Sequence, residues 1–346
     1  MSRKVGIYPQ EECAGDADLR SAPAYAAIDL GTGNCRMLMA SSVNGELCVF
    51  GSFSRIIRLG EGLSTGSRLG DAAIERAIDA LKVCSAKIHK GKVRRIRAVA
   101  TEACRRAANN REFAEKVKAE AGIVLETISA KEESELTLAG CAILLSADTP
   151  YGLIVDIGGG STELMWIELT QGRPPRLLDM ISIPLGVVAL AERFGCDAIS
   201  SRSYAEMMKL IDTGLSDFDA RNSIYGEIAG GKVQMLGTSG TVTMLGGLYL
   251  DLPHYSRSMV DGLDMDVEPV LAIASRLAAM NRAERAVIPC IGRQRAELAV
   301  GGCAFLEAIL RRWPVKRLRA ADRGIREGLL LGMMAEDGEL SSGAGR

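Results

Sequence analysis

Two segments of the chain carry an aspartate directly before a glycine-rich turn, and both follow an apolar run. They are Ala26-Ala27-Ile28-Asp29-Leu30-Gly31-Thr32-Gly33-Asn34 and Leu153-Ile154-Val155-Asp156-Ile157-Gly158-Gly159-Gly160-Ser161. Glycines let backbone N–H groups approach an anion closely, and a neighbouring carboxylate can hold a hydrated Mg²⁺ ion. The repeat therefore predicts a duplicated protein with a phosphate site between its halves.

Other glycine-rich motifs fit these segments less well. A dinucleotide-binding fingerprint needs a third glycine where Arg36 and Glu163 stand, and the chain has no G-x-x-x-x-G-K-[ST] phosphate loop. Two ordinary β-hairpins with glycine turns remain the structural alternative. Because the aspartate has the same offset in both copies, phosphate binding is the favoured interpretation.

Strands and helices are predicted to alternate around these turns. Strands are indicated at 35–40, 93–101, 123–129, 162–169, 177–183, 232–236 and 317–321, and helices near 74–88, 111–120, 132–145, 204–218 and 325–335. The strand at 232–236 runs into a third small-residue loop, Gly237-Thr238-Ser239-Gly240-Thr241, before another helix. This alternation predicts an α/β fold with mixed sheets.

Composition limits the classes of function. The 346-residue chain is long enough for two domains, and its net charge of −1 argues against a general polyanion binder. The nine cysteines contain no C-x-x-C pair, which favours reduced thiols in a cytoplasmic protein. We predict no membrane span, no nucleic-acid partner, and a flexible tail over residues 1–22.

The supply of histidine is small, since only His89 and His254 are present. Ser-His-Asp catalysis, His-ligated zinc and phosphohistidine transfer are therefore poorly supported. If the protein is an enzyme, carboxylates and Mg²⁺ must carry its chemistry. Asp156 is the best candidate for the metal by position, with Asp29 and Glu163 in support, and Mg²⁺ usually takes one or two carboxylates.

Several further segments form an ordered pattern with these turns. They are D-L-G-T-G-N (29–34), R-L-G-E-G (58–62), A-T-E-A-C-R (100–105), I-S followed by E-E (128–133), D-I-G-G-G-S-T-E (156–163), I-P-L-G (183–186), G-T-S-G-T (237–241) and D-R-G-I-R-E-G (322–328). In this order they resemble the exopolyphosphatase/guanosine pentaphosphate phosphohydrolase (Ppx/GppA) family, of the acetate and sugar kinase–Hsc70–actin superfamily. The resemblance runs from Tyr25 to about Met334 and is to the family's short, two-domain form.

The resemblance implies two duplicated actin-like domains of the ribonuclease H-like type with a cleft between them. We expect the first domain over residues 23–135, the second over 136–335 with its last helix packing on the first, and a C-terminal tail over 336–346. The three turns would cradle phosphate through Gly31, Thr32, Gly33, Asn34, Gly158, Gly159, Gly160, Ser161, Thr238, Ser239, Gly240 and Thr241.

The resemblance also implies catalytic roles for two residues. Glu133 matches the family's water-activating base, and Arg105 matches its phosphate-contacting arginine. From the residues alone, Glu132, Glu133 and Glu135 are first-turn acids favoured by the helix dipole, and Arg105 is a solvated arginine in a basic stretch. Glu135 stands where the family usually has arginine, which we interpret as a change in substrate preference.

These predictions describe a Mg²⁺-dependent phosphohydrolase. It would remove terminal phosphates from inorganic polyphosphate or the 5′-phosphate of guanosine pentaphosphate, with a homodimer as the candidate assembly. An ATP-dependent kinase of the same superfamily and a non-catalytic sensor of an alarmone or polyphosphate stay open as alternatives. Seven Lys and Arg residues between Arg311 and Arg326 would form either a track for a long polyanion or a solvated helix end.

Overall fold

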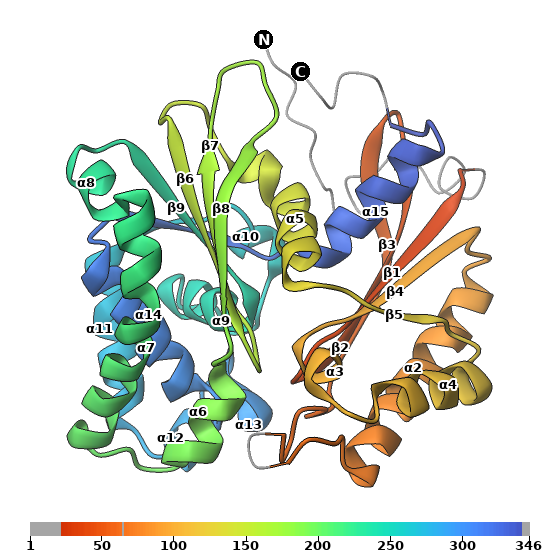
Figure 1. The fold of residues 1–346 in the computed structure, drawn as a ribbon, viewed down its shortest axis with the longest axis horizontal. Helices are drawn as coiled ribbons and strands as arrows, with labels where there is room; N and C mark the ends of the chain where they lie inside the picture. Colours follow the sequence, from red (N-terminus) through yellow and green to blue (C-terminus); the bar gives the residue numbers. More distant parts are fainter. Residues whose placement is uncertain (1–21, 64–65, 341–346) are drawn as a thin grey trace. The chain divides into compact units, whose positions relative to one another are not determined.

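The computed structural model describes residues 22–63 and 66–340 and divides them into two compact units (Figure 1). The first unit holds the described residues up to Ile143, residues 172–174 and the segment from Gly324 onward. The second unit holds Leu144–Gln171 and Pro175–Arg323. Residues 1–21 of the predicted N-terminal tail, and 341–346 of the predicted C-terminal tail, lie outside the described residues.

A five-stranded sheet forms the centre of the first unit. Its strands are β1 (Ala24–Leu30), β2 (Asn34–Val43), β3 (Glu46–Ile56), β4 (Arg95–Ala100) and β5 (Leu125–Thr127), in the order β3-β2-β1-β4-β5. β1, β2 and β3 are antiparallel, whereas β4 and β5 run parallel to β1. β3 was not predicted from the sequence, because this edge strand buries few side chains and lacks a clear apolar alternation.

Helices cover both faces of this sheet. They are α2 (Asp71–Lys90), α3 (Glu102–Arg106), α4 (Asn110–Ala121), α5 (Ala130–Cys141) and α15 (Ile325–Glu336). The predicted apolar face of α2 is buried, and α4 ends at Gly122 in the left-handed conformation that favours glycine. β1 feeds both cores: Ile28 packs in the core that includes α2 and α4, and Tyr25 packs in the core that includes α15.

The second unit has a six-stranded sheet flanked by helices. Its strands are β6 (Tyr151–Ile157), β7 (Thr162–Glu168), β8 (Arg176–Ile183), β9 (Val233–Thr238), β10 (Asp264–Asp266) and β11 (Arg317–Ala321), in the order β10-β11-β9-β6-β7-β8. Its helices are α6 (Val187–Phe194), α7 (Ser201–Asn222), α8 (Ile224–Ala229), α9 (Ser239–Tyr249), α10 (Arg257–Val260), α11 (Val267–Ala279), α12 (Arg282–Ala286), α13 (Gly292–Arg295) and α14 (Ala299–Arg312). A large apolar core joins this sheet to its helices.

The two sheets repeat one another in detail. β3-β2-β1-β4-β5 corresponds to β8-β7-β6-β9-β11, with three antiparallel strands followed by two parallel ones in each. The first hairpin closes at the pair Leu30–Cys35 and the second at Ile157–Thr162, so each turn has the same length. The register also shifts after Met39 and after Trp166, at the same distance from the preceding aspartate. The duplication predicted from the sequence is therefore present in the fold.

Two glycines bring α5 and α15 into close contact within the first unit. A Cβ atom at Gly140 would lie 2.1 Å from the carbonyl oxygen of Gly324, and one at Gly328 would lie 2.1 Å from that of Leu136. Real Cβ atoms do not approach backbone oxygen so closely, so larger residues at either position would force the helices apart. The N–H of Gly324 donates to the Glu327 carboxylate at 2.8 Å, which satisfies the first turn of α15.

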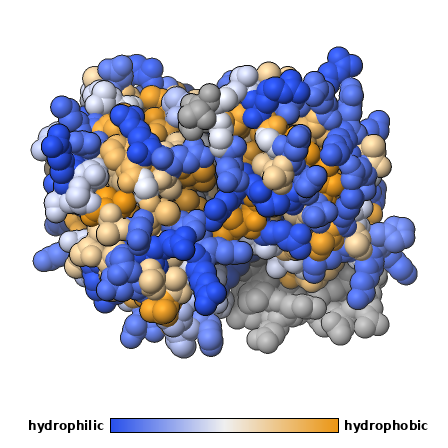
Figure 2. Space-filling model, turned by 90° about the horizontal axis from the view of Figure 1, so that it is seen from below, coloured by the Kyte–Doolittle hydropathy of each residue, from blue (hydrophilic) through white to orange (hydrophobic). Residues whose placement is uncertain are grey.

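The described surface mixes polar and apolar side chains, and most cysteines of this part of the chain are buried. Figure 2 shows hydrophilic side chains spread over the face that it draws, with apolar residues interspersed. Among the described residues, no helix is both long and apolar enough to cross a membrane. The eight cysteines of this part of the chain form no disulfide, and seven of them are buried.

A buried arginine holds together the helical part of the second unit. Arg285 has no exposed surface, and its guanidinium donates to the backbone carbonyls of Ala296 (3.0 Å), Cys196 (2.6 Å), Asp197 (2.9 Å) and Met280. Burial lowers the pKa of this guanidinium, because charge is disfavoured away from water. Its donors therefore link backbone segments that are far apart in the sequence of the second unit.

Replacing Arg285 with methionine is therefore expected to destabilise the protein strongly. The variant removes the hydrogen bonds that this fully buried side chain makes to several backbone carbonyls, which should lower the free energy of unfolding by about 3 kcal/mol. Urea unfolding of the full chain measures the change. Arg282→Met is the matched control, because Arg282 is exposed and pairs with Glu297 at 2.6 Å. Similar losses in both variants would contradict the role assigned to Arg285.

Candidate active site

Residues 57–60, which follow β3, support the first glycine turn (residues 31–34) from one side. The carbonyl of Gly33 accepts from the N–H groups of Ile57 and Arg58 at 2.8 and 3.0 Å, and the carbonyl of Thr32 accepts from Gly60 at 3.0 Å. A Cβ at Gly60 would lie 2.2 Å from Thr32 Cγ2, so only glycine fits there. The N–H of Gly33 belongs to the same peptide as the Thr32 carbonyl. Because a trans peptide points these two groups in opposite directions, the N–H of Gly33 faces away from the supporting segment.

The other two residues of the first turn close the hairpin. The N–H of Gly31 donates to the carbonyl of Asn34 at 2.9 Å, and Asn34 begins β2. The turn is thus held at its ends as well as from one side.

The second glycine turn has the same kind of support. The carbonyls of Gly158 and Gly159 accept from the first N–H groups of α6, Val187 at 3.1 Å and Val188 at 2.9 Å. A Cβ at Gly186 would lie 2.3 Å from the Gly159 carbonyl oxygen, which explains the glycine before α6. The peptide N–H groups that follow these carbonyls, those of Gly159 and Gly160, therefore face away from α6. Ser161, the last residue of the turn, is buried.

The third small-residue segment is not a loop, contrary to the sequence prediction. β9 continues to Thr238, and α9 begins at the next residue, Ser239. Ser239 makes this abrupt change of direction with φ 93°, a backbone conformation that residues other than glycine rarely adopt. Its hydroxyl oxygen is buried and has no hydrogen-bond partner among the described residues.

The second glycine turn and the junction between β9 and α9, called the third turn below, lie side by side in the second unit. Asp156 at the end of β6 pairs with Thr238 of β9 on one side and with Glu163 of β7 on the other. α14 packs close to the third turn, since a Cβ at Gly302 would lie 2.5 Å from Thr241 Oγ1. The fold therefore brings the Asp156 carboxylate, the second glycine turn and the start of α9 to one edge of this sheet.

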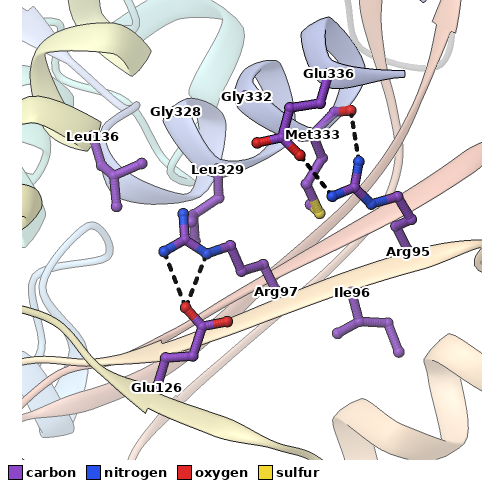
Figure 3. Close-up of a pocket in the computed structure, with 10 residues that line it drawn as sticks. All are labelled: Arg95, Ile96, Arg97, Glu126, Leu136, Gly328, Leu329, Gly332, Met333 and Glu336. Atoms are coloured by element: carbon purple, nitrogen blue, oxygen red, sulfur yellow. Dashed lines mark hydrogen bonds and ion pairs between the residues drawn. The ribbon is translucent and has the colours of Figure 1, made fainter.

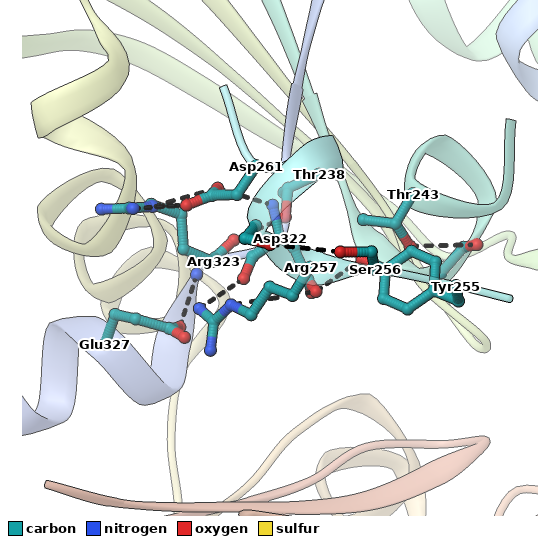
Figure 4. Close-up of polar contacts among 12 residues, drawn as sticks. Thr238, Thr243, Tyr255, Ser256, Arg257, Asp261, Asp322, Arg323 and Glu327 are labelled. Carbon is teal, nitrogen blue, oxygen red and sulfur yellow. Dashed lines mark hydrogen bonds and ion pairs between the residues drawn. The ribbon is translucent and has the colours of Figure 1, made fainter. Parts of the chain in front are cut away.

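A polar network fixes the chain beside the third turn (Figure 4). Thr238 Oγ1 donates to the carbonyl of Arg323 at 2.6 Å, and the Arg323 guanidinium pairs with Asp261. Tyr255 donates to Asp322 Oδ2 at 2.6 Å, and burial together with the Asp322 charge raises the pKa of this tyrosine. The D-R-G segment is thus anchored to β9. Asp261 and Tyr255 were not predicted from the sequence, because they lie in a stretch without a recognisable motif.

The first unit brings the two predicted catalytic residues into contact. Arg105 Nη1 donates to Glu133 Oε2 at 2.6 Å and to the carbonyl of Ile128 at 3.1 Å. Glu133 is 6% exposed, and it lies in the first turn of α5, whose N-cap Ser129 accepts from the N–H of Glu132. Burial disfavours the charged guanidinium, but the charges of Glu133 and Glu102 outweigh it and raise the pKa of Arg105.

The neighbouring acids of α5 have different surroundings. Glu132 accepts from Arg97 Nη2 at 2.6 Å. Glu135, which replaces the family's usual arginine, is exposed and lies 3.8 Å from Lys131. Of these acids, only Glu133 is both buried and in contact with Arg105, a difference that spacing along the helix did not reveal.

The two aspartates of the repeat differ in the residue opposite them. Asp29 pairs across the hairpin with Arg36, whereas Asp156 pairs with Glu163. Burial raises the pKa of Asp29, and the charges of Arg36 and Arg326 act against that rise. Glu163 is buried and accepts from Ser182 at 2.7 Å. No group of three or more His, Cys, Asp or Glu side chains that could hold a metal is found within residues 22–63 and 66–340.

The basic stretch near the C-terminus is largely neutralised by ion pairs. The pairs are Arg311–Glu307, Arg312–Asp212, Arg317–Asp266, Arg319–Asp264 and Arg323–Asp261. They involve five of its seven basic residues. This pairing favours a structural surface over a track for a long polyanion.

A separate cavity of about 270 Å³ lies in the first unit between β4 and α15 (Figure 3). Arg97 donates to Glu126 at 3.0 Å and Arg95 to Glu336 at 2.7 Å along its wall. The charges of the wall thus pair with one another. The lining residues that the structure describes include none of the predicted site residues.

The fold and these turns define a class of protein. A sheet of three antiparallel and two parallel strands occurs twice, each copy with an aspartate before a supported glycine turn. This is the duplicated ribonuclease H-like architecture of the actin-like superfamily, as the resemblance implied. A sequence profile of the Ppx/GppA phosphatase family matches residues 38–337, and the chain belongs to that family.

Solved structures support this assignment. The chain is 27% identical to a Ppx/GppA family member from Aquifex aeolicus, with 91% of this chain and 98% of that chain covered and a TM-score of 0.73. It is 26% identical to an exopolyphosphatase-like protein, with coverage of 90% and 99% and a TM-score of 0.81. An exopolyphosphatase from Cytophaga hutchinsonii, 23% identical with coverage of 92% and 100% and a TM-score of 0.81, shares the fold.

Proposed function

We propose that this phosphatase-family protein releases the terminal phosphate of inorganic polyphosphate, with guanosine pentaphosphate as the second candidate substrate. The observation that carries the proposal is the start of α9. Ser239 combines φ 93° with a buried hydroxyl that has no partner among the described residues. Strained backbone and unpaired buried polar groups persist where function requires them. A phosphate oxygen that accepts from Ser239 and from the first N–H groups of α9 would account for both.

The carboxylates of the second unit suit Mg²⁺. Asp156 and Glu163 are direct cross-strand neighbours, and a cation beside them would offset the repulsion between like charges in that relation. Two carboxylates with water in the remaining positions match the usual coordination of Mg²⁺. Asp29 faces Arg36 instead, so the proposal for the metal rests on Asp156 and Glu163. The bound ion would neutralise charge on the transferred phosphoryl group.

Glu133 is the proposed base for the attacking water. Hydrolysis of a phosphoanhydride needs a group that orients this water and accepts its proton. The hydrogen bond from Arg105 limits the rotation of the Glu133 carboxylate. Arg105 would in turn contact a phosphate oxygen of the substrate.

A comparison of substrates tests the proposal. The purified full chain is incubated with Mg²⁺ and either polyphosphate or guanosine pentaphosphate, without added ATP, and released phosphate is measured. We expect release from polyphosphate. A requirement for ATP and an acceptor would identify a kinase instead, and tight binding of either compound without turnover would identify a sensor.

Ser239→Ala tests the assigned contact separately. Loss of a hydrogen bond to a charged oxygen should raise KM for polyphosphate about tenfold. Ser41→Ala is the matched control, because the Ser41 hydroxyl of β2 is also buried without a partner among the described residues. Unchanged KM in the Ser239 variant would remove the proposed phosphate contact.

A further inference from the structure

Glu102 accepts hydrogen bonds from the edge of the Arg105 guanidinium that does not contact Glu133. Both Arg105 Nε and Arg105 Nη2 donate to Glu102 Oε2, at 3.2 and 3.0 Å. Nη1 is shared between Glu133 and the Ile128 carbonyl. A guanidinium has five N–H donors, so these four contacts leave one N–H, on Nη2, for a further acceptor.

The burial of Glu102 makes its ion pair with Arg105 important for stability. Glu102 is 9% exposed at the start of α3, directly after β4. A buried carboxylate is costly unless it is paired, and Arg105 is the partner that supplies two hydrogen bonds. Glu102 lies within the A-T-E-A-C-R segment, but the sequence alone indicated no role for it.

The charges of this cluster are unequal. Two carboxylates, Glu102 and Glu133, share one guanidinium, so the cluster carries a net charge of −1. Arg105 is therefore not committed to Glu133 alone. Without Glu102, the Nε–Nη2 edge of Arg105 would lose the hydrogen bonds that hold it, and the planar guanidinium could turn as a whole.

We propose that Glu102 is a positioning residue that holds the Nε–Nη2 edge of Arg105, so that Nη1 stays on Glu133 and one Nη2 N–H is kept for a substrate phosphate oxygen. This inference rests on the proposed function, because it assumes that Glu133 and Arg105 act on phosphate. Glu102 itself touches neither the water nor the substrate in this arrangement. Its effect on turnover must pass through Arg105.

A double-mutant cycle tests this dependence. Glu102→Gln should lower kcat for polyphosphate about tenfold in the wild-type background, because the amide holds the guanidinium less firmly than the carboxylate does. In the Arg105→Lys background, where the fork is already lost, the same change should alter kcat by less than about twofold. Equal effects in both backgrounds would overturn the proposal.

Glu307→Gln is the matched control for this cycle. Glu307 is also 9% exposed and also pairs with an arginine on its own helix, Arg311, but it belongs to the second unit, and its hydrogen-bond partners, Tyr204 and Arg311, are not candidate site residues. It should change stability without changing kcat. If Glu307→Gln lowers kcat as much as Glu102→Gln does, burial of any paired glutamate explains the loss and the proposal fails.

A second measurement needs no turnover. In ¹⁵N-labelled protein, the Nε–H signal of Arg105 is assigned by its loss in Arg105→Lys, and its exchange with water is followed. We expect slow exchange in the wild type and exchange at least about tenfold faster in Glu102→Ala. Unchanged exchange overturns the proposal. Exchange could be faster in Glu102→Ala while the wild type fails to hydrolyse polyphosphate. That result would support the contact between Glu102 and Arg105 and would overturn the proposed function instead.

Discussion

Replacing Glu133 with glutamine should lower kcat by about 10²–10⁴-fold, the loss that typically follows removal of a general base. The glutamine amide has the same shape but cannot take a proton from water. Because Arg105 also pairs with Glu102, the variant does not leave the buried guanidinium without a carboxylate. We therefore expect the fold to be retained, and turnover of polyphosphate by the purified variant measures the effect.

The matched control for this variant is Glu135→Gln on the same helix. Glu135 is exposed and contacts only Lys131 among the ion pairs that the structure describes, so its loss should leave kcat within about twofold. Thermal unfolding of both variants separates a chemical loss from a loss of structure. Near-wild-type turnover in Glu133→Gln would assign the base elsewhere, with Glu132 as the next candidate.

Asp156→Asn should raise the Mg²⁺ concentration needed for half-maximal activity at least about tenfold and lower the maximal rate as well. Asp156 lies opposite Glu163, and the two negative charges together favour a cation. The asparagine amide of the variant is neutral, so it removes one of these two charges. A Mg²⁺ titration of phosphate release measures the shift.

The comparison for Asp156→Asn is Asp264→Asn. Asp264 is also a strand carboxylate of the second unit's sheet, but its partner is Arg319 at 2.7 Å. This control should leave the Mg²⁺ titration unchanged. If the midpoint for Asp156→Asn coincides with that of the wild type, Asp156 does not hold the metal.

The contact between Arg105 and Glu133 changes how the proposed base is understood. The sequence suggested a carboxylate beside other acids, whereas the structure places a guanidinium 2.6 Å from Glu133. That guanidinium is itself shared with Glu102. The structure therefore connects Glu133 to Glu102 through Arg105, a link that the row of acids along α5 did not indicate.

Local pattern was sufficient for much of the fold. The two hairpins were predictable because an apolar strand, a glycine turn and a second strand lie within a few residues of each other. The buried face of α2 and the glycine end of α4 followed from helical periodicity and capping. β3 and the direct passage from β9 to α9 did not, because an edge strand and a strained φ at Ser239 leave no periodic signal.

The sequence by itself determined the duplication, the α/β class and the candidate turns, because each depends on residues that are neighbours along the chain. Only the tertiary structure decided which charges meet. Arg105 reaches Glu133 across 28 positions, and Arg323 reaches Asp261 across 62. Pairings of this kind depend on how strands and helices pack, and no local spacing encodes them.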